Sequence, residues 1–140
     1  DTLDKDLYLI CTGTGIAPFR SIAHFIHQKQ IPHKNIHLIF GCREFKDSLY
    51  EEELKQLEKM LPGFYHHPCF SRELVVGLGQ YTGYVHACYT DLIEKHKGMT
   101  GAIPDASFFL CGWKNMVDDA KQKLLEIGYE KQAIHLELYG

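Results

Sequence analysis

A glycine-rich turn stands near the start of the chain. Thr12-Gly13-Thr14-Gly15 follows an apolar run and leads into Ile16-Ala17-Pro18 at the start of an amphipathic segment. The glycines let the backbone turn tightly and approach a ligand, and Pro18 suits the first turn of a helix. A turn of this kind at a helix N-terminus can bind a pyrophosphate through its backbone N–H groups. Because Pro18 replaces the third glycine of G-x-G-x-x-G, a tight turn that binds nothing is the alternative.

Two further segments carry an arginine just after an apolar run. Arg43 follows Gly41-Cys42, and Ser71-Arg72-Glu73 follows the run that ends at Phe70. A hydroxyl beside a guanidinium suits a phosphomonoester, since Arg binds phosphate bidentately and Ser adds a hydrogen bond. In a dinucleotide site, an adenosine 2′-phosphate would lie there. The alternatives are that Arg43 caps a neighbouring helix, and that Ser71 caps a helix while Glu73 pairs with Arg72.

The last two apolar runs end in residues that suit a planar ligand. Gly112 lets a flat ligand lie against the backbone, and Cys111 places a small thiol beside it. Glu137 and Tyr139 share one face of the final run, because side chains alternate along a strand. A carboxylate and a phenol there could cover a flat cofactor; a buried core cysteine and a solvated sheet edge are the alternatives.

These segments all follow runs that the sequence pattern predicts to be strands. The predicted strands are 7–11, 36–40, 64–70, 107–111 and 134–138, and the predicted helices are 16–30, 49–60, 85–95 and 115–127, with a loop over 98–104. The alternation predicts an α/β fold: a doubly wound, mostly parallel five-stranded sheet with helices on both faces. Ligands of such folds bind beyond the carboxyl ends of the strands, so the segments above should meet.

Composition bounds the class of protein. The chain has 140 residues, 45% hydrophobic and 24% charged, which suits one domain over residues 1–140. A net charge of −3 speaks against a nucleic-acid-binding module, and no apolar run approaches the length of a membrane span. Five cysteines without a CxxC pair predict no disulfide framework and a cytoplasmic protein. We expect these cysteines to pack as small apolar residues, with some thiols accessible from the crevice as the alternative.

Nine histidines raise the question of a metal site. The densest cluster is His66-His67 with Cys69, but neighbouring residues of a strand point to opposite faces. The spacing matches no common zinc motif, so we predict no metal site.

Taken together, these segments resemble the NAD(P)-binding domain of the ferredoxin–NADP⁺ reductase superfamily, from Leu7 to Tyr139. The residues that carry the resemblance are Gly13-Thr14-Gly15-Ile16-Ala17-Pro18-Phe19-Arg20-Ser21, Phe40-Gly41-Cys42-Arg43, Leu49-Tyr50 with Glu52-Glu53-Leu54, Ser71-Arg72-Glu73, Tyr84-Val85, Cys111-Gly112 with Met116, and Glu137-Leu138-Tyr139.

The resemblance implies a role for each matching residue. The turn from Thr12 through Gly13, Thr14, Gly15 and Ile16 to Pro18 would hold the pyrophosphate and the nicotinamide side of the nucleotide. Ser71 and Arg72 would bind the 2′-phosphate of NADP, Tyr84 would stack on adenine, and Arg43, Gly112 and Met116 would complete the cofactor-binding set. Cys111 and Glu137 would lie near the nicotinamide ring and Tyr139 would stack on the flavin, which makes these three the catalytic set.

The resemblance also implies cofactors and partners. NADP is expected rather than NAD, although Thr82 and His86 replace a Lys and a Gln of plant members and Gly140 follows the terminal aromatic. FAD would be bound by an upstream β-barrel domain that this chain does not contain, so the domain by itself should bind nucleotide without transferring hydride. The whole protein would pass electrons to or from ferredoxin, flavodoxin or a similar carrier. An NADH-dependent oxygenase reductase and a non-catalytic nucleotide-sensing module are the alternatives.

Overall fold

The computed structural model describes residues 2–139, with the side chains of residues 3–136. Its strands are β1 (Asp6–Thr12), β2 (Ile36–Cys42), β3 (Phe64–Phe70), β4 (Tyr81–Thr82), β5 (Ala106–Trp113) and β6 (Ile134–Tyr139), and its helices are α1 (Ile16–Gln28), α2 (Glu51–Met60), α3 (Val85–Thr100) and α4 (Lys114–Ile127). Short 3-10 segments include Gly13–Gly15, which joins β1 to α1, and Phe45–Asp47, which follows β2.

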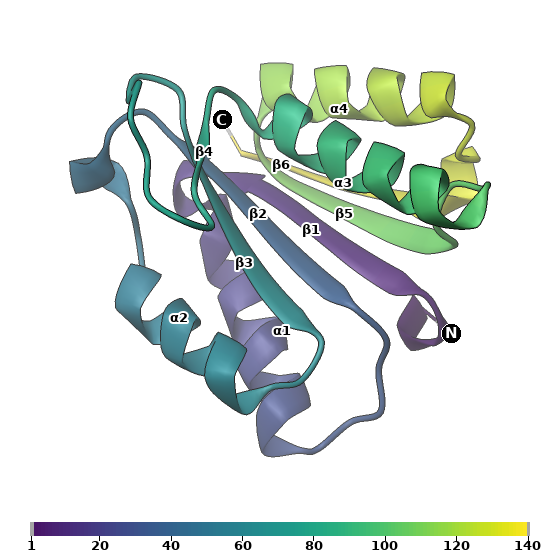
Figure 1. The fold of residues 1–140 in the computed structure, drawn as a ribbon, viewed down its shortest axis with the longest axis horizontal. Coiled ribbons are helices and arrows are strands. Elements are labelled where there is room, and N and C mark those ends of the chain that lie inside the picture. The colour runs from purple at the N-terminus through teal and green to yellow at the C-terminus, as the bar shows by residue number, and fades with distance from the viewer. Residues whose placement is uncertain (1, 140) are drawn as a thin grey trace.

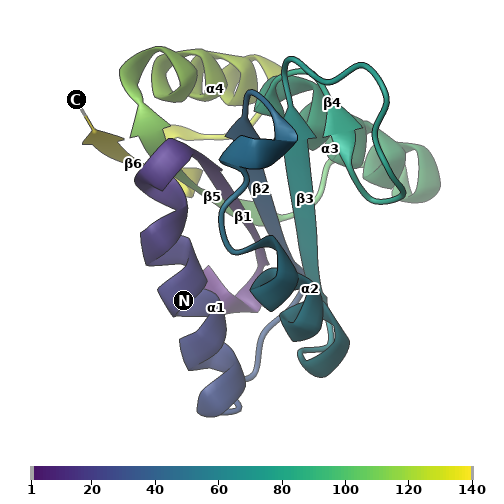
Figure 2. The same ribbon diagram turned by 90° about the vertical axis from the view of Figure 1, so that its left-hand side faces the viewer.

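The strands form one parallel sheet in the order β4-β3-β2-β1-β5-β6. Helices α1 and α2 cover one face of the sheet, and α3 and α4 cover the other (Figures 1 and 2). The chain runs outward from β1 to β3 and β4 on one side, and returns past β1 to β5 and β6 on the other. The strand order therefore reverses between β1 and β5, which is where doubly wound folds bind their ligands.

Burial on both faces explains why the strands are continuous apolar runs. Along β1, Leu7, Leu9 and Cys11 join the core beneath α1 and α2, whereas Tyr8 and Ile10 join the core beneath α3 and α4. The doubly wound α/β fold predicted from the sequence is confirmed.

The sheet has six strands, so the prediction of five was wrong. The missed strand, β4, is only two residues long and pairs with Cys69 and Phe70 at the end of β3. Two residues are too few to show the alternation by which a strand is recognised.

Three helix boundaries also differ from the prediction by two residues or more. The helix predicted from residue 49 begins at Glu51, because Tyr50 adopts a left-handed conformation with φ 59°. The first helix ends at Gln28, two residues early, and Gln30 has φ 51°. Helix α3 continues through Gly98 to Thr100 and ends at Gly101, whose φ of 84° is typical of a helix C-terminus.

Over residues 2–139, no helix combines the length and apolar character that a bilayer crossing requires. Among the described side chains, those of residues 3–136, no three His, Cys, Asp or Glu are grouped so that they could hold a metal ion.

Candidate functional site

The glycine turn packs directly against the end of β5. Gly13 has φ 54°, which favours glycine, and a Cβ on Gly15 would stand 2.5 Å from the carbonyl oxygen of Cys111. Gly112 has φ 146°, and a Cβ there would clash with Oγ1 of Thr12. These glycines therefore let the backbones after β1 and within β5 come into contact at the point where the strand order reverses.

Thr12 joins the two strand ends with a side-chain hydrogen bond. Its Oγ1 accepts a hydrogen bond of 3.1 Å from the backbone N–H of Trp113. Thr14, within the turn, is exposed; Pro18 lies in the first turn of α1, and Ile16, the first residue of α1, is fully buried. Ile16 therefore positions the turn from the core and does not face a ligand itself.

The ends of β2 and β3 bring the two predicted arginines together. The N–H of Ser71 donates to the carbonyl of Cys42 at 3.0 Å, and the N–H of Arg72 donates to the carbonyl of Arg43 at 2.9 Å. Among the residues whose side chains are described, neither Arg43 nor Arg72 forms an ion pair. Glu73 accepts a hydrogen bond from the N–H of Phe45 at 3.0 Å, so the alternative pairing with Arg72 is not observed.

A cavity of about 570 Å³ lies at this carboxyl edge of the sheet. Six residues of the predicted cofactor-binding set line it, namely Thr12, Arg43, Ser71, Arg72, Tyr84 and Met116. The remaining lining residues were not in that set; they are Gly41, Cys42, Gly83, Val85, His86, Trp113, Asn115 and Asp119. The sequence thus predicts the cavity, its two arginines and Met116 on α4. It does not predict the rest of the wall that α4 and the end of β5 provide, namely Trp113, Asn115 and Asp119.

The cavity is suited to an anion. Helices α3 and α4 both begin at it, with His86 in the first turn of α3 and Asn115 in the first turn of α4. Helix N-termini carry a partial positive charge, which adds to the charges of Arg43 and Arg72. One carboxylate, that of Asp119, also lines the wall. The residues present therefore fit a nucleotide that carries phosphate groups.

His86 is neutral around pH 7. Burial lowers the pKa of its imidazole, and the nearby Asp119 carboxylate opposes this shift only in part. Its Nδ1 lies 2.7 Å from the hydroxyl of Tyr89.

The predicted catalytic set lies apart from this cavity or outside the described side chains. Cys111 is fully buried and lines a smaller cavity of about 200 Å³ with Phe19, Phe109 and His135 among others. Backbone pairing between β5 and β6 sets Glu137 beside Cys111 and Tyr139 beside Trp113. The side chains of Glu137 and Tyr139 lie outside the described part of the chain, so the roles of all three residues stay predictions.

The five cysteines are free and buried. Four of them are 0% exposed, so the alternative of thiols accessible from the crevice is left only for Cys42, which is 8% exposed. Cys42 lines the large cavity, where burial, reinforced by the Asp47, Glu51 and Glu73 carboxylates, raises its pKa to about 12. Its thiol is consequently protonated at neutral pH and is a poor nucleophile.

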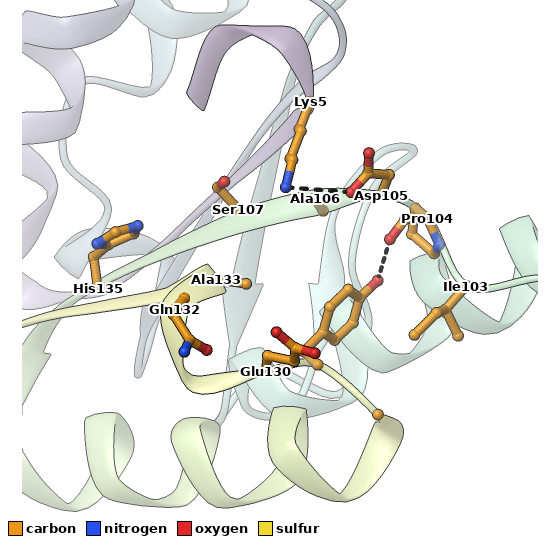
Figure 3. Close-up of a pocket in the computed structure, with 12 residues that line it drawn as sticks. Lys5, Ile103, Pro104, Asp105, Ala106, Ser107, Glu130, Gln132, Ala133 and His135 are labelled. Atoms are coloured by element: carbon orange, nitrogen blue, oxygen red, sulfur yellow. Dashed lines mark hydrogen bonds and ion pairs between the residues drawn. The ribbon is translucent and has the colours of Figure 1, made fainter. Parts of the chain in front are cut away.

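A second cavity of similar size, about 560 Å³, opens at the amino edge of the sheet (Figure 3). Two contacts join its polar groups: Lys5 Nζ lies 3.6 Å from Asp105, and the Tyr129 hydroxyl donates to the carbonyl of Pro104 at 2.7 Å. It also lies at the edge opposite to the glycine turn and the two arginines. The cavity at the carboxyl edge is therefore the candidate functional site.

Comparisons with known proteins place the chain in a family and agree with its fold. Residues 9–122 match the oxidoreductase NAD-binding domain family. The chain is 29% identical over 141 aligned positions to a subunit of the Na(+)-translocating NADH-quinone reductase of Klebsiella pneumoniae, and 30% identical to the corresponding subunit of Neisseria meningitidis. Each alignment covers 98% of this chain and 33% of the relative.

Solved structures show the same fold. A ferredoxin NADP⁺ reductase from Neisseria gonorrhoeae with bound FAD and NADP superposes with a TM-score of 0.77 at 26% identity, over 96% of this chain and 56% of that one. A cytochrome P450 reductase from Amycolatopsis superposes with a TM-score of 0.78 at 22% identity, over 96% and 37% respectively.

The fold and the site thus define a nicotinamide-nucleotide-binding domain of the ferredoxin–NADP⁺ reductase type. The chain belongs to the oxidoreductase NAD-binding domain family, and it spans about a third of the length of the curated relatives that it matches.

Proposed function

We propose that this domain binds NADP(H) and holds its nicotinamide for hydride exchange with an FAD carried by another domain of the same protein. The observation that carries the proposal is the pair of guanidiniums, Arg43 and Arg72, that lack ion-pair partners among the described side chains and line a cavity where two helices begin. Two guanidiniums that pair with none of the described carboxylates keep their N–H donors available, and phosphate oxygens match the geometry of those donors.

In this proposal, the parts of the nucleotide follow the order of the strands along the carboxyl edge of the sheet. Ser71 and Arg72 follow β3, Arg43 follows β2, the glycine turn follows β1, and Cys111 lies on β5. A dinucleotide laid along this edge would place its 2′-phosphate at Ser71 and Arg72 and its pyrophosphate between Arg43 and the turn. The nicotinamide would then reach β5. Tyr84 is 73% exposed, which leaves its ring free to stack on the adenine.

The residues near β5 and β6 would position the reacting ring. When bound, FAD supplies the two-electron acceptor or donor for the hydride at nicotinamide C4. In this proposal Cys111 packs near that carbon from the core, and Glu137 provides a carboxylate beside the ring. Tyr139 covers the flavin face that the nicotinamide must reach. Electrons would continue to ferredoxin, flavodoxin or a similar carrier.

The second candidate is a domain that uses NADH. The relatives from Klebsiella and Neisseria are named as NADH-quinone reductase subunits. Thr82 and His86 also stand where plant members of the superfamily carry a Lys and a Gln. In this case Arg72 would contribute little to nucleotide affinity.

Calorimetric titration with 2′,5′-ADP and 5′-AMP separates the two candidates. An NADP site predicts that 2′,5′-ADP binds more than about tenfold more tightly, a difference of about 1.4 kcal/mol, and that Arg72→Ala removes this preference. Lys97→Ala, in the last turn of α3 and far from the cavity, is the matched control. Equal affinities for the two ligands would support the NADH candidate, and binding of neither would overturn nucleotide binding by this domain.

A further inference from the structure

Trp113 stands at the candidate site without a role in the proposed function. It is the only tryptophan of the chain and the last residue of β5. It lines the cavity and is 51% exposed, which is unusual for the largest apolar side chain.

The backbone of Trp113 is fixed while its ring stays open to solvent. Its N–H donates to Oγ1 of Thr12, and it forms the N-cap of α4. A Cβ built on Gly13 would lie 3.6 Å from Cζ2 and 3.8 Å from Nε1 of the indole. The indole therefore lies against the glycine turn, and a side chain at residue 13 would take up the space between them.

The ring also lies near a cation. The guanidinium carbon of Arg43 lies 6.0 Å from the indole centroid, at the outer limit of a cation–π contact. Arg43 and Trp113 thus stand on either side of the end of β1, and Arg72 lies one strand further from Trp113, at the end of β3.

We propose that the indole of Trp113 contacts the nicotinamide-riboside half of the bound nucleotide. This inference rests on the proposed function, because it uses the same order of nucleotide along the sheet edge. The adenosine phosphate would lie at Ser71 and Arg72 and the pyrophosphate at the turn. The nicotinamide riboside, which is the next group along the nucleotide, would then meet the side chain of Trp113. An exposed indole there offers an apolar face for stacking and an N–H donor for a ribose or phosphate oxygen.

The test compares a whole dinucleotide with its adenosine half. Trp113→Ala should weaken NADP⁺ binding about tenfold, while its affinity for 2′,5′-ADP changes less than about twofold. Trp113→Phe, which keeps an aromatic face, should retain NADP⁺ affinity to within about threefold. Unchanged 2′,5′-ADP binding also shows that the Trp113→Ala domain is folded.

Fluorescence gives an independent readout, because all tryptophan emission comes from this residue. NADP⁺ should change the emission intensity or wavelength at saturation, and 2′,5′-ADP should change it much less. The inference is overturned if NADP⁺ leaves the emission unchanged, or if Trp113→Ala binds NADP⁺ as tightly as the parent domain or more tightly. Failure of the parent domain to bind 2′,5′-ADP would instead count against the proposed function.

Discussion

Replacing glycine by alanine should have opposite effects on stability at two positions of this chain, Gly15 and Gly98. At Gly15, a methyl group would stand 2.5 Å from the Cys111 carbonyl oxygen, and neither backbone can move without disturbing β1 or β5. At Gly98, inside α3, a methyl group would meet nothing within 4 Å. Gly15→Ala should therefore lower the free energy of unfolding by about 1–3 kcal/mol, as overpacking does. Gly98→Ala should raise it by about 0.5–1 kcal/mol, through the higher helix propensity of alanine.

Urea unfolding of the two variants measures this contrast, and each serves as the control for the other. A Gly15→Ala domain as stable as the parent would show that the turn does not press against β5. It would also remove the structural reason for glycine at that position, leaving nucleotide binding as its only role.

Residues at strand ends were predictable from the sequence to the extent that the strands themselves were. Arg43, Ser71 and Arg72 meet because the carboxyl ends of parallel strands share one edge. Asn115 and Asp119 were missed because the sequence does not say which helix leans over that edge. Their spacing of four places them on one helix face beside a strand end, and this was the available signal.

At the scale of elements, a polar cluster joins α1 to α2. Glu53 on α2 accepts hydrogen bonds from both Nε and Nη2 of Arg20 on α1, the latter at 2.9 Å, and lies 2.7 Å from Nε2 of His24. The guanidinium also lies 4.5 Å from the centroid of the Tyr50 ring. The Arg20 hydrogen bond, assisted by His24, lowers the pKa of Glu53 to about 2.

Glu53→Gln should lower the free energy of unfolding by about 1 kcal/mol at pH 7, because a bidentate, partly shielded ion pair contributes more to stability than an exposed one does. Asp91→Asn removes the exposed pair with Lys95 within α3 and should cost less than about 0.5 kcal/mol. Denaturant titrations of both variants check the difference. Equal losses would mean that the cluster between α1 and α2 contributes no more than a surface ion pair.

Elements were predicted well where burial on both faces made a long apolar run, and poorly where conformation depends on one residue. Strands β1, β2, β3, β5 and β6 were all found from such runs. The sequence pattern placed Tyr50 inside a helix, although its left-handed conformation makes it the N-cap of α2. Gly98 was placed at the start of a loop, yet it lies inside α3, because a single glycine costs only about 1 kcal/mol and packing of the preceding turns outweighs it.

At the scale of the whole molecule, buried and half-buried histidines make stability depend on pH: His86, whose pKa is lowered, and three others with larger shifts. Burial lowers the pKa of His37 to about 4, of His66 to about 4 and of His67 to about 3, whereas the ordinary value is 6.5. Between these values the unfolded chain binds more protons than the folded one, so the free energy of unfolding falls as the pH drops from 6.5 towards 4. Each histidine adds at most about 1.4 kcal/mol per pH unit to this fall.

We therefore expect the urea midpoint to decrease from pH 7 to pH 5, and the decrease to be smaller in His67→Gln because one fewer proton is taken up on unfolding. His67 suits this test because its Nε2 lies 3.0 Å from Nδ1 of His37, and the amide of Gln can replace that hydrogen bond. His135→Gln, which replaces a histidine at an exposed position, is the control for the substitution itself. A parent domain whose midpoint is constant from pH 7 to 5 would show that these imidazoles are hydrated and protonate in the folded state.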